Sequence, residues 1–387
     1  MQQEEQPLAP EASREIRTLD AENPQAPLLA GPEPEPEHGP RWIFMGAQGL
    51  RAGWSVLIFV ALLVLFAQAI SFVALRVHVV SKGSSFSIRN QFAGELITFL
   101  AMLGAGTIVA LIERRSILDY NLRGPRRLPH FVSGLAAGFG ALSALVGALA
   151  WGGWLHFGPV ALSGKQIFIY GLAWAGVFLL VGFVEEGTMR CYFLFTLTRG
   201  LNFWIAAGIN GAICLDLILR SKGNGVWGVY AIALLGVVPC LILHLKKAPS
   251  AGFWQAAWVT STFFGFVHTG NDGENWIGIF AAAFIGFVFC VSVRLTSSAW
   301  WAIGCHAAWD WAETYFYGTA DSGLVAKGHL LSTSPTGQTL WSGGADGPEG
   351  SLLVLPVILL ILAFLLVVYG RKRRAALQIG ATEQLAS

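Results

Sequence analysis

Charged side chains are scarce in this sequence. Only 12% of its 387 residues are Asp, Glu, Lys or Arg, about half the share of an ordinary soluble domain. Apolar stretches of bilayer-crossing length recur along the chain, from residues 53–75, which carry no charge, to residues 352–369. A soluble fold can bury one such helix but not a whole set of them. The sequence therefore predicts an all-α, polytopic transmembrane helix bundle.

Several familiar signals are also missing. The five cysteines show no CxxC spacing and lie in or beside apolar stretches, which argues against a disulfide framework or a thiolate zinc site. The N-terminal segment has no basic region followed by an apolar core, so we expect no secretory signal peptide. No basic run with interleaved aromatic residues is present. We therefore expect no nucleic-acid partner.

The two ends of the chain differ in composition from its centre. Residues 1–40 hold nine acidic residues and eight of the sixteen prolines, a composition that cannot bury enough apolar area to fold. We predict a disordered acidic tail there, a transmembrane bundle over 41–370 and a basic tail over 371–387. Hydropathy gives ten candidate spans within the bundle: 53–75, 92–112, 131–155, 167–198, 203–219, 226–245, 253–269, 276–294, 299–317 and 351–369.

Basic residues in the loops predict the orientation. The loop 113–128 contains five arginines, and four consecutive basic residues follow the last span at 371–374. Loops rich in Lys and Arg stay in the cytoplasm, whereas the loop 318–350 has a single lysine and should face outward. Ten spans with a cytoplasmic N-terminus satisfy all three loops. We predict a plasma-membrane protein with both termini in the cytoplasm.

Two spans have unusual features. Segment 203–219 is short, contains Asn210 and Asp216, and is followed closely by 226–245. We predict a helical hairpin inserted over 203–245 and expect 203–219 not to cross the membrane cleanly. In the third span, Gly134 and Gly138 lie four residues apart, a spacing that permits close contact between helices. A helix that is merely rich in glycine explains the same spacing.

Ionisable residues interrupt three of the spans. A charged side chain at the bilayer centre costs about 2.5–3.5 kcal/mol on insertion scales, so it indicates a functional site. In the first cluster, Glu186 and Arg190 lie one helical turn apart and can form an ion pair. Glu185 is rotated by about 100° from Glu186 and is left without that partner. A purely structural ion pair at a helix end would explain Glu186 and Arg190 but not Glu185.

The other two clusters contain histidine. His268 ends the apolar run that includes Phe264, and His306 lies one turn before Asp310. A carboxylate in this position can fix the tautomer of a histidine through a hydrogen bond. Taken singly, His268 could be an interfacial side chain, and His306 with Asp310 a buried polar pair.

Together the clusters suggest catalysis. A free carboxylate and two histidines from separate helices can activate a water and stabilise an oxyanion. The same groups, His268, His306 and Glu185, also match the His/His/Glu sets that bind catalytic zinc. The residues leave open whether the site uses Zn²⁺ or works without metal.

Three motifs occur in order on successive predicted helices: Glu-Glu-x-x-x-Arg at 185–190, Phe-x-x-x-His at 264–268 and His-x-x-x-Asp at 306–310. This order resembles the CPBP (CAAX protease and bacteriocin-processing, or Abi) family, which includes the type II CAAX prenyl endopeptidases. The similarity covers residues 166–317. It implies a protease core of eight membrane helices, the number that remains when the hairpin is set aside.

The resemblance also implies a role for each residue. Glu185 would activate the hydrolytic water together with His268, and Glu186 and Arg190 would brace the helix. His306 and Asp310 would lie where the family stabilises the tetrahedral oxyanion.

The chain departs from the family pattern at two places. Asp310 stands where the CAAX endopeptidases have asparagine. An ionised aspartate cannot donate a hydrogen bond, so it must be protonated, orient His306 or hold a metal. The chain between Arg190 and His268 is also unusually long. For Glu185 and His268 to share one depth, we expect the fourth helix to continue to about Thr198.

The predicted function is an intramembrane endopeptidase that hydrolyses membrane-associated peptides or proteins, with a metalloprotease mechanism as one option. Its partners would be the lipid bilayer and that substrate. A non-enzymatic membrane protein is the alternative, with a role in bacteriocin resistance, scaffolding or ion- or proton-coupled transport. Inverted repeats or paired broken helices would favour a transporter, and the sequence shows neither.

Overall fold

The computed structural model describes residues 41–46, 49–78, 87–221, 226–248, 250–271, 273–321 and 323–371, and for 41–42, 221 and 226–235 only the backbone. The predictions for the 1–40 tail and for the basic tail beyond residue 371 lie outside these residues. Short elements open the described chain: α2 (Arg41–Phe44), β1 (Met45–Gly46) and β2 (Gly49–Leu50).

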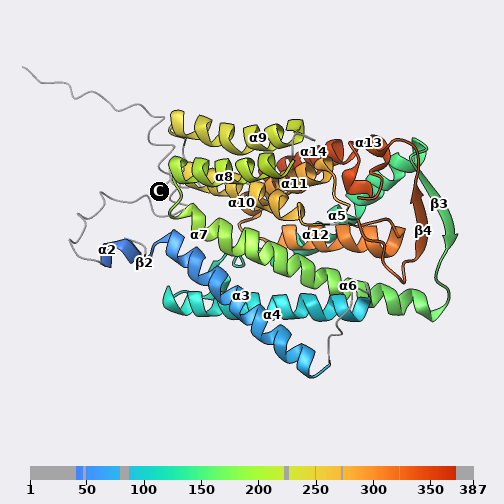
Figure 1. The fold of residues 1–387 in the computed structure, drawn as a ribbon, viewed down its shortest axis with the longest axis horizontal. Helices are drawn as coiled ribbons and strands as arrows, with labels where there is room; N and C mark the ends of the chain where they lie inside the picture. The colour runs from blue at the N-terminus through green and yellow to red at the C-terminus, as the bar shows by residue number, and fades with distance from the viewer. Residues whose placement is uncertain are drawn as a thin grey trace, which may run out of the picture.

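The main body is a bundle of helices that run side by side (Figure 1). Its longer helices are α3 (Ala52–Arg76), α4 (Ile88–Ile112), α5 (Arg127–Trp151), α6 (Lys165–Glu186), α8 (Phe203–Ser221), α9 (Val226–Leu245), α10 (Ala251–His268), α11 (Trp276–Thr296), α12 (Trp300–Trp311) and α14 (Val354–Leu365). Six helices of the described chain are long and apolar enough to cross a membrane. The prediction of a polytopic helical bundle is confirmed.

The fourth predicted span is one long helical segment. α6 continues through a π-helical stretch, Gly187–Phe193, into α7 (Leu194–Thr198), and the whole run from Lys165 to Thr198 is apolar enough to span a membrane. The expected extension to Thr198 is therefore confirmed. A π-helical stretch widens the helix by one residue and is frequent at functional sites.

The segment 203–245 forms two packed helices, as the predicted hairpin requires. α8 and α9 lie beside each other and against α10 (Figure 1), and Asn210 Nδ2 donates to the Gly236 carbonyl at 2.9 Å. The expectation that 203–219 does not span cleanly stays a prediction. α8 is continuous, and its Phe203–Arg220 stretch is long and apolar enough to cross a membrane.

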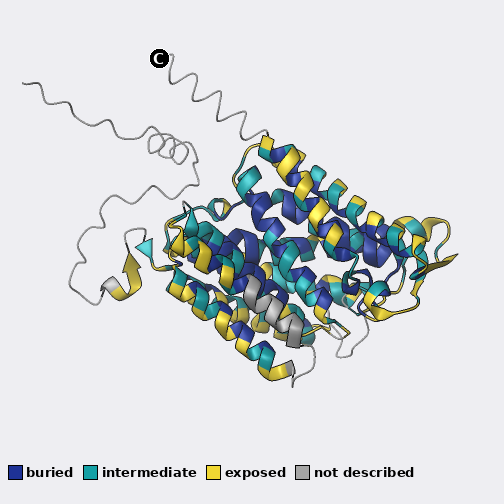
Figure 2. Ribbon diagram, turned by 90° about the horizontal axis from the view of Figure 1, so that it is seen from above, coloured by how far each residue is buried: buried dark blue, intermediate teal, exposed yellow. Residues whose placement is uncertain are grey.

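The core between α5 and α12 is held by glycine contacts. Gly134 and Gly138 of α5 face the backbone of α12 so closely that a Cβ on either would overlap the carbonyl oxygen of Trp301 or Cys305. Gly304 of α12 meets α5 in the same way at the Phe131 carbonyl. The close contact that the spacing of Gly134 and Gly138 permits therefore exists. Figure 2 shows buried residues filling the interior of the bundle.

A small sheet covers one end of the bundle, which hydropathy did not predict. β3 (Leu155–Val160) pairs antiparallel with β4 (Leu331–Pro335), with Leu155 opposite Pro335. Figure 1 shows the pair at the end of the bundle opposite α7. Because β4 belongs to the long loop between α12 and α14, that loop is attached to the bundle rather than free. Within it are α13 (Thr339–Ser342) and the turn Pro348–Gly350.

The α5–α12 contact gives a test of the fold. Gly138→Ala should destabilise the protein by about 1–3 kcal/mol, the usual cost of forcing extra atoms into a packed core. The measurement is the midpoint of thermal unfolding in detergent. Gly140→Ala is the matched control, since a Cβ at Gly140 meets nothing within 4 Å. Equal midpoints for the two variants would contradict the close contact.

Candidate active site

The site begins where α6 changes into the π-helical stretch. Glu185 and Glu186 are the last two residues of α6, and Arg190 lies inside the stretch. The π-helical register shifts the backbone pairing, so that the Leu194 N–H reaches the Met189 carbonyl. The Arg190 carbonyl accepts a further hydrogen bond, at 2.7 Å, from the Asn121 side chain of the α4–α5 loop. The local geometry at the glutamates is therefore tied to a second part of the chain.

Glu186 and Arg190 form the predicted ion pair. Arg190 Nη1 lies 3.2 Å from Glu186 Oε1, and both side chains are completely buried. The guanidinium also stacks over Phe264 of α10, 4.4 Å from the ring centroid, which is the geometry of a cation–π contact. The pair thus links α6 to α10 in the centre of the bundle.

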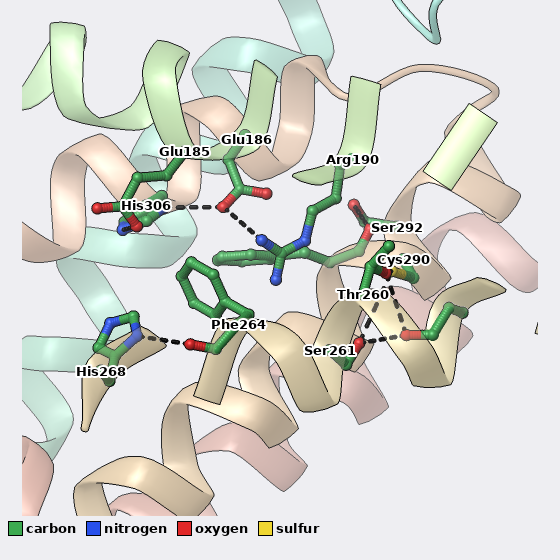
Figure 3. A network of polar contacts seen from close by, with 12 residues as sticks. Glu185, Glu186, Arg190, Thr260, Ser261, Phe264, His268, Cys290, Ser292 and His306 are labelled. Carbon is green, nitrogen blue, oxygen red and sulfur yellow. Dashed lines mark hydrogen bonds and ion pairs between the residues drawn. The ribbon is translucent and has the colours of Figure 1, made fainter. Parts of the chain in front are cut away.

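Glu186 also holds His306. His306 Nδ1 lies 2.9 Å from Glu186 Oε1, the same oxygen that pairs with Arg190. A carboxylate only accepts, so Nδ1 is the donor and carries a proton. Figure 3 shows this line of contacts from His306 through Glu186 to Arg190.

The other nitrogen of His306 faces two further carboxylates. Nε2 lies 3.5 Å from Asp310 Oδ2 and 3.7 Å from Glu185 Oε2. We expected Asp310 to fix the His306 tautomer, but His306 Nδ1 donates its short hydrogen bond to Glu186 instead. An i,i+4 spacing brings Asp310 close to the ring without aiming it at Nδ1. Glu185 is the most open of the three, with 36% of its side chain exposed.

His268 faces this group from α10. Its Nδ1 lies 2.8 Å from the Phe264 carbonyl, so Nδ1 carries the proton, and in the neutral ring Nε2 keeps its lone pair. Figure 3 shows His268 across from Glu185 and His306, beside the Phe264 ring. The arrangement leaves a basic nitrogen available for a water or a substrate.

The depths of Glu185 and His268 agree. The Thr198 carbonyl lies against Gly252 at the start of α10, which gives the two antiparallel helices a common reference point. Glu185 precedes Thr198 by thirteen residues, and His268 follows Gly252 by sixteen. At a rise of 1.5 Å per residue, Glu185 lies about 20 Å and His268 about 24 Å along the helix axis from this contact. The two side chains therefore come from nearly the same level of the bundle.

A cavity of about 60 Å³ lies between the two histidines, with His268, His306 and Asp310 in its wall. A single water needs about 10–15 Å³ measured in the same way, so the cavity has room for several. Its other walls are largely apolar, including Phe264 and Phe289. Glu185 is not part of this wall and reaches His306 from the α6 side.

The long loop adds acids that sequence reasoning missed. Asp321 accepts a hydrogen bond from Thr314 Oγ1 at 2.7 Å, and Glu349 from Trp309 Nε1 at 2.7 Å. Burial raises the pKa of Asp321. The negative charge of Glu185 adds to this shift, whereas positive charge on His306 or His268 opposes it. Glu349 also lines the cavity. No spacing in the sequence links these residues to the histidines, because only the folded loop brings them there.

The predicted zinc ligands are not assembled. Ligand atoms bound to one tetrahedral zinc at 2.0–2.2 Å lie roughly 3.5 Å apart. Within the described chain, Glu185, His268 and His306 do not form a group whose ligand atoms all lie within 4.8 Å of one another. His306 Nδ1 is also engaged by Glu186. The residues as placed do not fit the metal, and the chemistry proposed below uses none.

Comparison with known proteins identifies the segment that carries the histidines. Residues 239–312 match the family model described as type II CAAX prenyl endopeptidase Rce1-like. The matched segment is similar to the type II CAAX prenyl endopeptidases, the family that the three motifs resemble. This match spans His268, His306 and Asp310, whereas Glu185 of the same family pattern lies before it. No curated protein and no solved structure matches the chain.

The match connects the segment that carries two of the three motifs to a family described as endopeptidases. The long apolar helices of the described chain agree with a multi-pass membrane protein. The three motifs, far apart in sequence, meet through Glu186, His306 and Phe264.

The ion pair predicts an order of stabilities. Glu186→Ala leaves Arg190 buried without its carboxylate, and the loss of one partner from a buried pair costs about 3–5 kcal/mol. Glu185→Ala removes a half-exposed side chain and should cost much less. Thermal unfolding of both variants in detergent measures the difference. The reverse order would show that Glu185, not Glu186, is the bracing residue.

Glu274, in the loop between α10 and α11, predicts a pH dependence. Burial raises its pKa from 4.5 to about 8, and the Asp346 carboxylate adds to the shift. The folded state then keeps a proton that the unfolded chain releases, so stability should fall as pH rises from about 5 to 8.

Glu274→Gln should flatten this decline in the unfolding midpoint. Asp216→Asn is the control, because Asp216 forms an exposed ion pair with Arg220 on α8. A decline of the same slope in Glu274→Gln would show that other groups cause it.

Proposed function

We propose that this protein is an intramembrane endopeptidase in which Glu185 and His268 activate a water that attacks a peptide carbonyl. The observation that carries the proposal is that His306 and His268 line one cavity inside an apolar bundle and that Glu185 lies 3.7 Å from His306. The family match supports the reaction class, and this arrangement supports the choice of groups.

Glu185 suits the role of general base. Glu186 is engaged by both Arg190 and His306, whereas no hydrogen bond from an arginine or lysine to Glu185 is present in the described chain. Glu185 therefore has a carboxylate oxygen free to take a proton from water. His268 lines the cavity and adds a lone pair on Nε2 that can orient the same water.

His306 suits the role of oxyanion stabiliser. When protonated, it donates from both nitrogens, and Nδ1 is already fixed by Glu186. Nε2 is then the donor that meets the oxygen of the tetrahedral intermediate. Asp310, 3.5 Å from Nε2, is a positioning residue that holds the ring. This is one of the roles open to an aspartate at a position where the CAAX endopeptidases have asparagine.

The reaction then balances without a further reagent. Glu185 takes one proton from the water as the water oxygen bonds to the peptide carbonyl carbon. The carbonyl oxygen becomes the oxyanion and accepts from His306. As the C–N bond breaks, the proton on Glu185 moves to the leaving nitrogen. The products are a carboxylic acid and an amine, and transfer of the acid proton to the amine gives a carboxylate and an ammonium group.

The substrate class follows from the surroundings. The cavity wall combines the two histidines with Phe264, Phe289, Ile285 and Ile358, and the site lies among membrane helices. An apolar wall around a few polar groups suits a peptide that carries a hydrocarbon chain. A prenylated peptide with a CAAX terminus is therefore the first substrate to test.

The decisive experiment uses Glu185→Gln. The purified full chain in detergent or vesicles is incubated with a prenylated CAAX peptide, and release of the C-terminal tripeptide is measured by mass spectrometry. Loss of a general base should lower the rate by about 10²–10⁴-fold, with an unchanged unfolding midpoint.

Asp216→Asn on α8 should cleave at the wild-type rate. Wild-type cleavage by Glu185→Gln would overturn the assignment of the base. A folded wild-type protein that cleaves no membrane-associated peptide, prenylated or not, would favour a non-enzymatic role.

A further inference from the structure

Three carboxylates that have no part in the proposed hydrolysis meet at the end of α12, next to the cavity that Glu349 lines. Glu313 lies in the π-helical stretch Ala312–Tyr317, Asp321 follows it in the long loop, and Glu349 lies in the turn Pro348–Gly350. One oxygen of each lies within 4.8 Å of an oxygen of the other two. The three come from separate turns of the chain, so the fold and not the local sequence gathers them.

This concentration of negative charge has few partners. No lysine or arginine forms an ion pair with Glu313, Asp321 or Glu349 in the part of the chain that the structure describes. Trp309 Nε1 is shared, at 3.1 Å from Glu313 Oε2 and 2.7 Å from Glu349 Oε1. One neutral N–H donor serves two carboxylates, which does not offset their charge.

Glu313 supplies a second, independent observation. Its side chain is completely buried, and its Oε1 has no hydrogen-bond donor among the described residues. A buried oxygen of this kind costs free energy unless something binds it. Close by, Asp346 repeats the pattern, since it is 1% exposed and its Oδ1 is also without a donor. Glu313 Oε1 and Asp346 Oδ1 are both acceptors, so a cation can satisfy them and another acceptor cannot.

We propose that Glu313, Asp321 and Glu349 bind a divalent cation of the calcium type. All three ligands offer oxygen, which hard cations such as Ca²⁺ prefer. Two ligands of one Ca²⁺ ion, each at 2.3–2.6 Å, lie at most about 5 Å apart, and the three carboxylate oxygens lie within that limit. Backbone carbonyls and water can complete the six to eight ligands that Ca²⁺ takes.

Such an ion would have a structural effect beyond charge neutralisation. Asp321 and Glu349 lie at opposite ends of the long loop, and Glu313 belongs to the helix that carries His306 and Asp310. The ion would therefore fasten the loop to that helix, one turn beyond Asp310. This proposal does not depend on the proteolytic function, and its test uses no activity measurement.

The test is calcium binding by the purified full chain in detergent after treatment with a chelator. Calorimetric titration with CaCl₂ should show binding, and thermal unfolding should shift upward with calcium concentration. At one hundred times Kd, the expected rise in the midpoint is about 3 °C for a chain of this size. NaCl at matched ionic strength should give no such rise.

Asp321→Asn and Glu349→Gln should each weaken calcium binding at least about tenfold. They are preferred to Glu313→Gln, because Glu313 is buried and its substitution could prevent folding. Asp216→Asn, which removes an exposed carboxylate on α8, should bind like the wild type.

Two results would overturn the proposal. The first is a folded wild-type protein that binds no calcium. The second is undiminished binding by both Asp321→Asn and Glu349→Gln. A higher midpoint in those variants, with no calcium response in the wild type, would show that the carboxylates are protonated instead.

Discussion

The arrangement of the site depends on one buried carboxylate, Glu186. The same oxygen accepts from Arg190 and from His306, and it does so where neither Glu186 nor Arg190 is reached by solvent. A buried ion pair contributes little net stability against an apolar alternative, but it penalises every arrangement in which a partner is missing. Glu186 thereby specifies how α6, α10 and α12 face one another, and it leaves the adjacent Glu185 free.

The helical frame was predictable because its signals are local. The expected extension of the fourth helix to Thr198 is confirmed. The spacing of Gly134 and Gly138 left a close helix contact and a merely glycine-rich helix open, and the structure has the contact. The division between a paired Glu186 and an unpaired Glu185 also followed from helical geometry alone, since adjacent residues on a helix point about 100° apart.

What could not be predicted depends on tertiary contacts. The partner of His306 Nδ1 is Glu186, 120 residues away in sequence, whereas spacing within one helix had favoured Asp310. The positions of Asp321 and Glu349 depend on the long loop, whose attachment through β3 and β4 has no signal in hydropathy. The π-helical stretches were missed for the same reason, because no residue type marks a one-residue change of register.

The hydrogen bond from Asn121 to the Arg190 carbonyl connects the α4–α5 loop to the buried helix that carries the ion pair. Loops and buried helices ordinarily differ in how much amino-acid substitution they accept. Asn121 adopts φ = +53°, a left-handed backbone conformation that asparagine tolerates better than most residues. The α4–α5 loop is thus held in a restricted shape at the point where it reaches the interior. Surface loops ordinarily accept substitution easily. This loop must keep the backbone shape that lets Asn121 reach the Arg190 carbonyl. We therefore expect its amino-acid sequence to change no faster than that of the buried helices it contacts.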